Sequence, residues 1–272
     1  MLDTGHATTD NCDRIATAFV AARRAGASIG TYPGEVPDDF ATAYSIQERA
    51  IALDGRAIAG WKVGRVNSPL AETYGVTRLV GPIFDSNVHS ATQSSIAMPV
   101  YAGGFAAVEA ELLLRIDTLP GGDPAALDDA AIMGHVGTVH VGIEIASSPY
   151  AGINRDGPLV TASDFGNNAG LICGPELPDW RTRNLSNVSA SVAIDGAEVG
   201  RADMRALPGG PIESVRFLLS HLATRSAPMP LPFWVSAGAI SGVHPIDIGS
   251  IAVASFDDAQ SITCQIVAAQ AQ

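Results

Sequence analysis

Apolar residues recur at helical spacing near the start of the chain. Ile15 and Phe19 stand four residues apart within such a pattern, which predicts an amphipathic helix over residues 10–26. A similar pattern predicts a second helix over 38–55, opened by two aspartates that suit the positive end of a helix dipole. Together these helices make a helical N-terminal segment, which we expect to span residues 1–56.

From residue 57 onwards the pattern changes to short apolar runs separated by turn residues, such as the hairpin dipeptide Asp195-Gly196. One more helix is predicted over Pro211–Thr224, where proline suits the first helical position. We therefore predict an α+β protein with a larger, β-rich domain over residues 57–272. The runs that read as strands are Ile58–Val63, Leu79–Phe84, Val108–Ile116, Val136–Ile145, Ala169–Cys173, Val188–Ile194, Phe233–Ala237, Ile251–Phe256 and Ile262–Val267.

Composition limits the classes of partner. A hydrophobic content of 47% with 16% charged residues describes a globular protein, and the net charge of −12 argues against nucleic acid and against anionic membrane surfaces. No apolar run reaches the roughly 18 residues of a membrane span, and no signal peptide is recognisable. The three cysteines lack metal or disulfide spacing. We expect a reduced, cytoplasmic protein.

Two acidic residues interrupt the apolar run Val108–Ile116. Glu109 and Glu111 stand two positions apart, so on a strand their side chains point to the same face. Two carboxylates this close to each other repel, and each is destabilised when it loses solvent. A divalent cation would offset both effects. The alternative is a solvated strand face that carries two unremarkable glutamates. The apolar neighbours favour the metal.

A third acid lies alone in the apolar run Val136–Ile145. A buried glutamate is uncommon unless it is paired or coordinated, so Glu144 is the natural third metal ligand. Its alternative is an ion pair with an arginine, for example Arg115 or Arg155.

The chain contains fifteen arginines and one lysine, Lys62. Lys62 lies between Trp61 and Val63 in a segment bracketed by glycines. Loss of solvent there would lower the pKa of the amine and suit it to proton transfer, which an arginine cannot perform. The alternatives are a coding bias towards arginine and a lysine that reaches solvent from a sheet edge.

Other polar residues stand where strands meet loops. Asp85 ends the run Leu79–Phe84. Asn167 and Asn168 could bind a ligand or simply form a turn. The histidines show no ligand spacing, and no phosphate-binding loop or nucleophile elbow is present.

Several short motifs follow one another in a recognisable order. They are Ala43-Tyr-Ser-Ile-Gln47, Gly60-Trp-Lys-Val-Gly64, Gly81-Pro-Ile-Phe-Asp85, Val108-Glu-Ala-Glu111, His140-Val-Gly-Ile-Glu144 and Ala237-Gly-Ala-Ile240. As a set they resemble the 2-keto-4-pentenoate hydratase family, within the fumarylacetoacetate hydrolase superfamily. The similarity runs from about residue 12 to residue 267.

This resemblance implies a fumarylacetoacetate-hydrolase-like mixed β-sheet roll, a Mg²⁺ or Mn²⁺ cofactor and a homo-oligomer. The metal ligands would be Glu109, Glu111 and Glu144. The catalytic pair would be Lys62 and Asp85. The substrate-binding residues would be Val63, Asn168 and Gly238.

The activity implied is the addition of water to a small anionic 2-hydroxy-2,4-dienoate, giving a 4-hydroxy-2-oxo acid in the meta-cleavage pathway of aromatic catabolism. A 4-oxalocrotonate-type decarboxylase is an alternative, and it would need a further cation such as Arg65 or Arg78. A C–C hydrolase would need a Glu–His pair, which no motif supplies. A non-catalytic partner subunit that keeps the fold is the last alternative, suggested by Gly170 where the family shows a serine of the substrate pocket.

Overall fold

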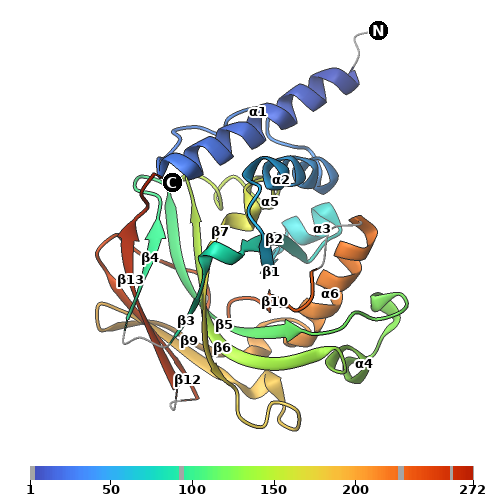
Figure 1. Ribbon diagram of the computed structural model, residues 1–272, viewed down its shortest axis with the longest axis vertical. Coiled ribbons are helices and arrows are strands. Elements are labelled where there is room, and N and C mark those ends of the chain that lie inside the picture. The colour runs from blue at the N-terminus through green and yellow to red at the C-terminus, as the bar shows by residue number, and fades with distance from the viewer. Residues whose placement is uncertain (1–3, 92–94, 226–229, 258–259, 272) are drawn as a thin grey trace.

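The computed structural model describes residues 4–91, 95–225, 230–257 and 260–271. Two helices lie across one end of the molecule, a third covers one side, and long curved strands run through the body (Figure 1). The three helices predicted from the sequence are confirmed as α1 (Thr4–Ala25), α2 (Phe40–Asp54) and α6 (Gly210–Arg225). Within the described residues, no helix is long and apolar enough to cross a membrane.

Local sequence explains where α2 begins and ends. The Asp39 carboxylate accepts a hydrogen bond from the Thr42 backbone N–H at 2.7 Å, which satisfies a free donor of the first turn. At the other end, Gly55 takes a left-handed conformation and its N–H reaches the Ile51 carbonyl.

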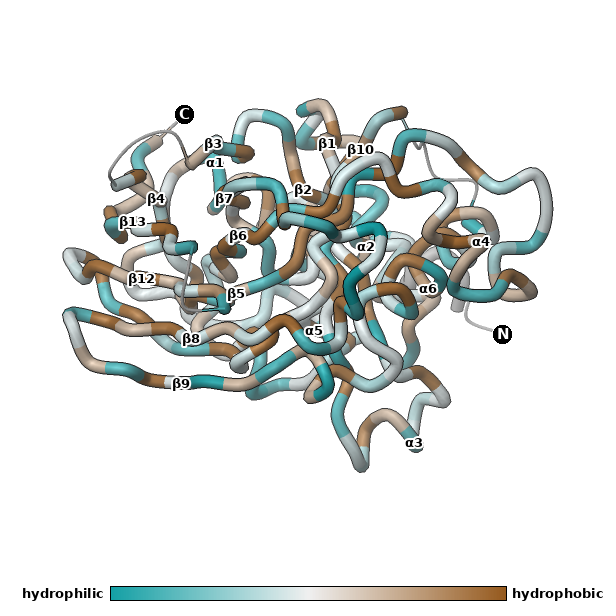
Figure 2. Tube along the Cα trace, turned by 90° about the horizontal axis from the view of Figure 1, so that it is seen from below, coloured by the Kyte–Doolittle hydropathy of each residue, from teal (hydrophilic) through white to brown (hydrophobic). Residues whose placement is uncertain are grey.

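The shorter helices escaped the sequence analysis because they span too few residues to show a period. One of them, α3 (Leu70–Tyr74), has no buried residue and projects from the body (Figure 2). The others are α4 (Asp129–Met133) and α5 (Pro158–Ser163), with single 3₁₀ turns at Asp85–Asn87, Pro124–Ala126, Phe165–Asn167, Leu185–Asn187 and Met204–Ala206.

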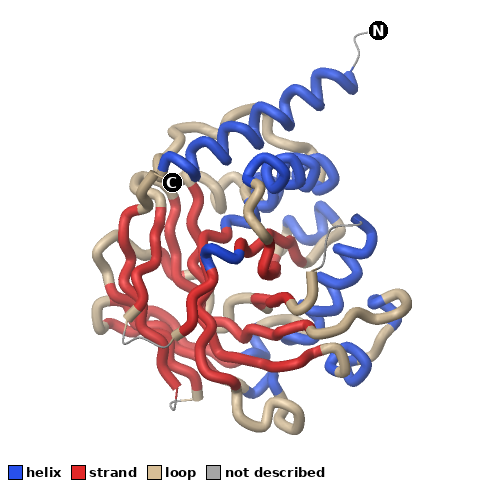
Figure 3. Tube along the Cα trace, viewed as in Figure 1, coloured by secondary structure: helices blue, strands red, loops and turns tan. Residues whose placement is uncertain are grey.

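The strands form two sheets, seen in red in Figure 3. The larger has the order β2-β1-β10-β5-β6-β7-β3, with β11 paired to β5. Its strands are β1 (Ile58–Arg65), β2 (Arg78–Phe84), β3 (Val88–Ser90), β5 (Phe105–Ile116), β6 (Val136–Ser148), β7 (Asn168–Glu176), β10 (Phe233–Ser236) and β11 (His244–Pro245). Parallel pairs at β1–β10 and β3–β7 make this sheet mixed.

The smaller sheet has the order β4-β13-β12-β8-β9. Its strands are β4 (Ile96–Val100), β8 (Ser189–Ile194), β9 (Ala197–Asp203), β12 (Ile251–Phe256) and β13 (Gln260–Ala268). All nine predicted strands are present, and Asp195-Gly196 forms the β8–β9 turn. The strands missed are β3, β4, β9 and β11. Two of these are very short, and β9 is largely exposed and rich in charged residues.

Apolar side chains of both sheets form one core cluster. Leu112 and Val141 of the larger sheet belong to it together with Val192, Ala254 and Ile266 of the smaller one. The predicted α+β class with a mixed β roll is confirmed.

The N-terminal helices share a second core cluster with the β-rich body. Ile15 and Phe19 of α1 and Ile46 of α2 pack in one cluster with Phe84 and Phe165. The segment predicted as residues 1–56 therefore contributes to a common interior.

A buried ion pair joins α1 to the body. The Arg23 guanidinium contacts the two Asp164 carboxylate oxygens at 2.6 and 2.9 Å, and neither side chain is more than 4% exposed. Arg23 also donates to the backbone carbonyl of Asn168 at 3.0 Å, and the Ser148 hydroxyl donates to Asp164 at 2.6 Å. Such hydrogen bonding is needed to offset the cost of removing two charges from water.

We expect Arg23→Gln to lower the free energy of unfolding by about 3–5 kcal/mol, because Asp164 would remain buried without its cation. Arg14→Gln on the same helix is the control: Arg14 is exposed and bonds to Asn11, so it should change stability by less than about 0.5 kcal/mol. Urea denaturation monitored by tryptophan fluorescence measures both. Equal stability of the two variants would show that the pair is not needed to hold α1.

Candidate active site

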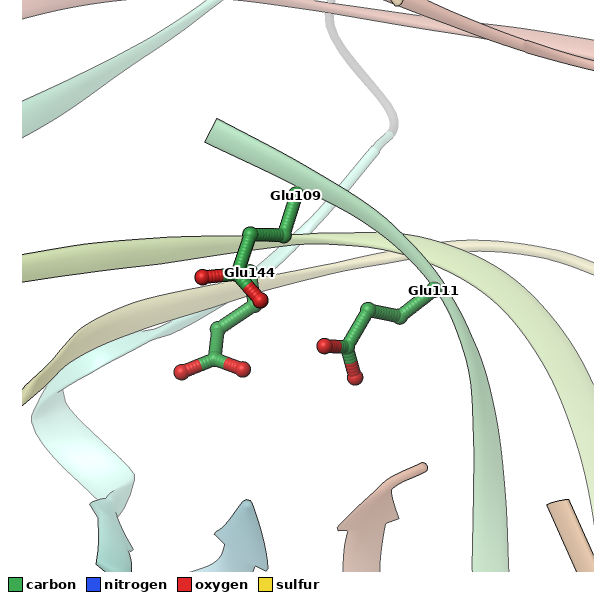
Figure 4. A group of neighbouring side chains, drawn as sticks. All are labelled: Glu109, Glu111 and Glu144. Atoms are coloured by element: carbon green, nitrogen blue, oxygen red, sulfur yellow. The ribbon is translucent and has the colours of Figure 1, made fainter. Parts of the chain in front are cut away.

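Three buried glutamates meet where β5 and β6 pair. The antiparallel register places Glu109 directly opposite Glu144, and Glu111 follows on the same face of β5. One carboxylate oxygen from each lies within 4.8 Å of the others, and the side chains point towards a common space (Figure 4). Their exposed fractions are 4% for Glu109 and 0% for Glu111 and Glu144. The structure thus brings together the three residues that the sequence singled out.

Glu111 is held by donors from the end of β10. Its Oε2 accepts hydrogen bonds from the Ser236 hydroxyl at 2.5 Å and from the Gly238 backbone N–H at 2.9 Å. Its Oε1 is buried and has no hydrogen-bond partner among the residues that the structure describes.

Glu144 is held from two other directions. Its Oε1 accepts a hydrogen bond from the Asn168 amide at 3.0 Å and lies 3.3 Å from the Lys62 ammonium. Its Oε2 is also buried, and no described residue forms a hydrogen bond with it. Buried carboxylate oxygens are normally satisfied, so two unpartnered ones facing a shared space need an explanation.

Burial and repulsion from neighbouring carboxylates disfavour the charged forms of Glu109 and Glu111. Burial, with a smaller contribution from Glu144, raises the pKa of Glu109 to about 7, although Lys62 acts in the opposite direction. The pKa of Glu111 is raised well above its usual range, first by burial and then by Glu144 and Glu109. A divalent cation would balance the charge of three carboxylates beside one ammonium and would occupy the unpartnered oxygens. The donor set, all hard oxygens, suits Mg²⁺ or Mn²⁺.

Lys62 projects from β1 into the same region and is 4% exposed. Besides its contact with Glu144, its ammonium donates to Asn167 Oδ1 at 3.2 Å. Burial lowers the pKa of this amine, but the negative charges of Glu144, Glu109 and Glu111 together raise it above its usual range. The lowered pKa expected from the apolar neighbours is therefore wrong for the site without a cation. Neutralising the carboxylates would remove much of the raising effect.

A left-handed turn delivers the two asparagines. Phe165, Gly166 and Asn167 all have φ between 53° and 59°. The turn packs so closely on β2 that a Cβ at Gly81 would lie 1.9 Å from the Phe165 carbonyl oxygen, so this position requires glycine. Asn167 consequently reaches Lys62, and Asn168 reaches Glu144. The sequence left a ligand role and a turn role open for this pair. In the structure it forms the turn and bonds the site residues.

A cavity of about 640 Å³ opens onto this site. Lys62, Glu109 and Asn167 line its inner end, and Asn154 contributes further out, with its side-chain oxygen accepting a hydrogen bond from the Asn167 amide at 3.0 Å. No histidine of the described chain lines it.

Asp85 is not brought to Lys62. It begins the 3₁₀ turn after β2, is exposed, and its backbone N–H bonds to the Ala57 carbonyl. Lys62 is paired with Gly81, four residues earlier on β2, so about 13 Å of strand separates the two positions. The predicted catalytic pair of Lys62 and Asp85 is therefore not assembled. The antiparallel pairing carries the end of β2 away from the site.

Val63 and Gly238 occupy supporting positions. Val63 alternates with Lys62 along β1, and its side chain belongs to the hydrophobic core. The backbone N–H of Gly238, whose φ is 113°, donates a hydrogen bond to Glu111 and so helps to hold this candidate metal ligand in place. Asn168 likewise bonds Glu144. None of these three residues is among those that line the cavity, and their contact with substrate stays a prediction.

Gly170 does not face the cavity either. A Cβ at this position would lie 2.6 Å from the Met98 methyl group and 3.2 Å from the Asn87 carbonyl oxygen. The expectation that Gly170 removes a hydroxyl from the substrate pocket is therefore wrong.

The sequence analysis missed Ser236 and Asn154. Ser236 carries no signal in its own segment, and it reaches Glu111 because β10 pairs antiparallel with β5, where Ser236 stands opposite Leu113. Asn154 lies in a loop, where asparagine is common for its turn-forming ability alone.

No family model matches the chain, and no curated protein matches it. Solved structures do. The 4-oxalocrotonate decarboxylase from Pseudomonas putida G7, complexed with magnesium and adipate, aligns with 95% of this chain and 98% of its own at a TM-score of 0.80 and 19% identity.

Two further structures align less completely. The fumarylpyruvate hydrolase from Pseudomonas aeruginosa, in complex with Mn²⁺ and pyruvate, covers 78% of this chain and 91% of its own at a TM-score of 0.53 and 18% identity. The 2-hydroxyhepta-2,4-diene-1,7-dioate isomerase from Mycobacterium marinum covers 77% and 75% at a TM-score of 0.52 and 17% identity. At these identities the likeness concerns the fold: the chain has the fold of the fumarylacetoacetate hydrolase superfamily.

Proposed function

We propose that this protein is a divalent-metal-dependent hydratase that adds water to a 2-hydroxy-2,4-dienoate and forms a 4-hydroxy-2-oxo acid. One observation carries the proposal: three buried carboxylates, two of them with unpartnered oxygens, meet a buried ammonium at the inner end of a cavity. The solved structures with this fold include complexes of magnesium with adipate and of Mn²⁺ with pyruvate, which supports a metal and a small organic acid here.

Glu109, Glu111 and Glu144 would hold Mg²⁺ or Mn²⁺. The bound cation would withdraw electrons from the carboxylate and the 2-oxygen of the substrate, which favours the keto form on which water adds. It would also explain how an acidic protein binds an anion. Ser236, Gly238 and Asn168 fix the directions of two of the three carboxylates.

Lys62 would handle protons. Conversion of the dienol to its keto form removes a proton from the 2-hydroxyl and adds one to carbon. The Lys62 amine is a buried, proton-exchanging group that lines the cavity, and Glu144 and Asn167 fix its position.

A second candidate is a decarboxylase of the 4-oxalocrotonate type. It is favoured by the alignment over nearly the whole chain with such an enzyme. It is also favoured by Arg65, which lines the cavity and, among the described residues, makes one long hydrogen bond, 3.4 Å, to the Ala206 carbonyl. Arg78 is not available for this role, because it is buried and donates to Ser214 and Pro208.

The two activities separate in one assay. Freshly generated 2-hydroxypenta-2,4-dienoate is followed in the ultraviolet with Mg²⁺, with Mn²⁺ and with chelator, and CO₂ is detected with 4-oxalocrotonate. We expect metal-dependent loss of dienoate absorbance without a partner protein. Metal-dependent CO₂ release without hydration, lost in Arg65→Met, would establish the decarboxylase instead.

Lys62→Met should reduce turnover by about 100-fold or more, because it removes the proton-exchanging group while keeping a side chain of similar length. Mg²⁺ binding, measured by calorimetry, should persist, since all three carboxylates remain. Undiminished turnover in this variant would contradict the role assigned to the amine.

Glu109→Gln should weaken Mg²⁺ binding. Loss of a residue that only orients a metal ligand typically lowers metal affinity by roughly 10–100-fold, and the loss of a ligand itself should cost at least as much. Glu198→Gln, an exposed change on β9, is the control and should bind Mg²⁺ like the parent. Titration calorimetry compares the two, and equal affinities would exclude Glu109 as a ligand.

Mg²⁺ affinity of the parent protein should fall as the pH drops below about 7. The pKa of Glu109 is raised to about 7 and that of Glu111 is raised as well, so protons occupy these carboxylates at lower pH and must leave when the cation binds. Each displaced proton weakens apparent affinity by about tenfold per pH unit below the pKa. Calorimetry at pH 6 and pH 8 in buffers of different ionisation enthalpy gives affinity and proton release. Constant affinity without proton release would contradict the shift.

A further inference from the structure

The cavity has two chemically different ends. Lys62, Glu109 and Asn167, each no more than 4% exposed, make the inner end. That end suits the charged head of the proposed substrate. The inference that follows concerns the rest of the cavity and rests on the proposed function for the head.

An apolar wall begins directly beside the amine. The position of a Cβ at Gly64 is 3.7 Å from Lys62 Nζ and 3.3 Å from a Leu79 methyl group, so amine and leucine flank the same glycine. A Cβ at Gly238, which holds Glu111, would likewise lie 3.3 Å from a Leu207 methyl group. Leu79 and Leu207 both line the cavity and are 4% and 6% exposed.

The wall continues to the surface. Leu70 at the start of α3 and Val243 in the loop before β11 both line the cavity, although they are 39% and 47% exposed. These side chains come from segments far apart in the sequence, and α3 stands away from the body (Figure 2). Because both side chains belong to the lining of one cavity, a ligand that fills the cavity would contact them.

The size of the cavity agrees with this reading. The cavity volume of about 640 Å³ lies within the range of roughly 300–1,000 Å³ seen for pockets that bind drug-sized ligands, well beyond the needs of a five-carbon acid. Arg65, on the outer lining, is a cation that could pair with a carboxylate on the tail, and this is the alternative that 2-oxoadipate tests. A carboxylate on the tail would have to lose solvent against leucine and valine side chains.

We propose that the site selects 2-oxo acids and 2-hydroxydienoates that carry an uncharged, apolar tail of several carbons. The head binds at the carboxylate and lysine end. The tail packs along Leu79 and Leu207 and ends between Leu70 and Val243.

Equilibrium binding of stable head-group analogues tests this. Pyruvate, 2-oxobutanoate, 2-oxohexanoate and 2-oxooctanoate are titrated into the Mg²⁺-loaded protein by calorimetry, with 2-oxoadipate as the dicarboxylate of matched length. We expect affinity to rise about threefold for each added methylene. 2-Oxoadipate should bind at least tenfold more weakly than 2-oxohexanoate.

The double variant Leu70→Ser, Val243→Ser should remove most of the gain between 2-oxohexanoate and 2-oxooctanoate and leave pyruvate affinity unchanged. Both positions are exposed, so the fold should tolerate the change. Leu53→Ser, at a 48% exposed leucine of α2 that does not line the cavity, is the matched control and should retain the full gain.

Two failures are distinguishable. If pyruvate binds in a Mg²⁺-dependent way but affinity is independent of tail length, or 2-oxoadipate binds more tightly than 2-oxohexanoate, the apolar-tail inference is overturned and the head-group site stands. If no 2-oxo acid binds in the presence of Mg²⁺, the proposed function and this inference are both overturned.

Discussion

Repulsion among three buried carboxylates is the constraint on which the rest of the site depends. Glu109 and Glu144 face each other across one strand pair, an arrangement that destabilises a sheet unless positive charge intervenes. The protein answers with donors from three separate segments: the Lys62 ammonium on β1, the Asn168 amide at the start of β7, and the hydroxyl and backbone N–H groups at the end of β10. Two carboxylate oxygens still have no hydrogen-bond partner among the described residues, and these unpartnered oxygens make the site suitable for a cation.

One short segment connects this site to the N-terminal helices. Asp164 binds Arg23 of α1, Asn167 binds Lys62, and Asn168 binds Glu144. Only the left-handed turn between them lets consecutive residues reach partners in different directions. This turn can pack against β2 only because Gly81 has no side chain. Backbone conformation, packing and site geometry are therefore determined together here.

The sequence supported the local features of this picture well. The two-residue spacing of Glu109 and Glu111, an isolated acid on an apolar strand and a single lysine are visible without a structure, because alternation along a strand is a local property. Register between strands is not local. The antiparallel pairing of β2 with β1 carries Asp85 away from Lys62, and Ser236 enters the site because β10 lies between β1 and β5. Whether Gly170 and Gly238 face the cavity likewise depends on contacts between strands that are distant in the sequence.

The contact between Arg23 and the Asn168 carbonyl has a thermodynamic consequence. Asn168 also bonds Glu144, so a ligand that orders the carboxylates would be coupled to the docking of α1 to the extent that these two hydrogen bonds form together. Such coupling is reciprocal: the factor by which helix docking increases cation affinity equals the factor by which the cation increases the docking equilibrium. The first helix of the chain and the centre of the β-rich body are thus connected through five consecutive residues, Asp164 to Asn168.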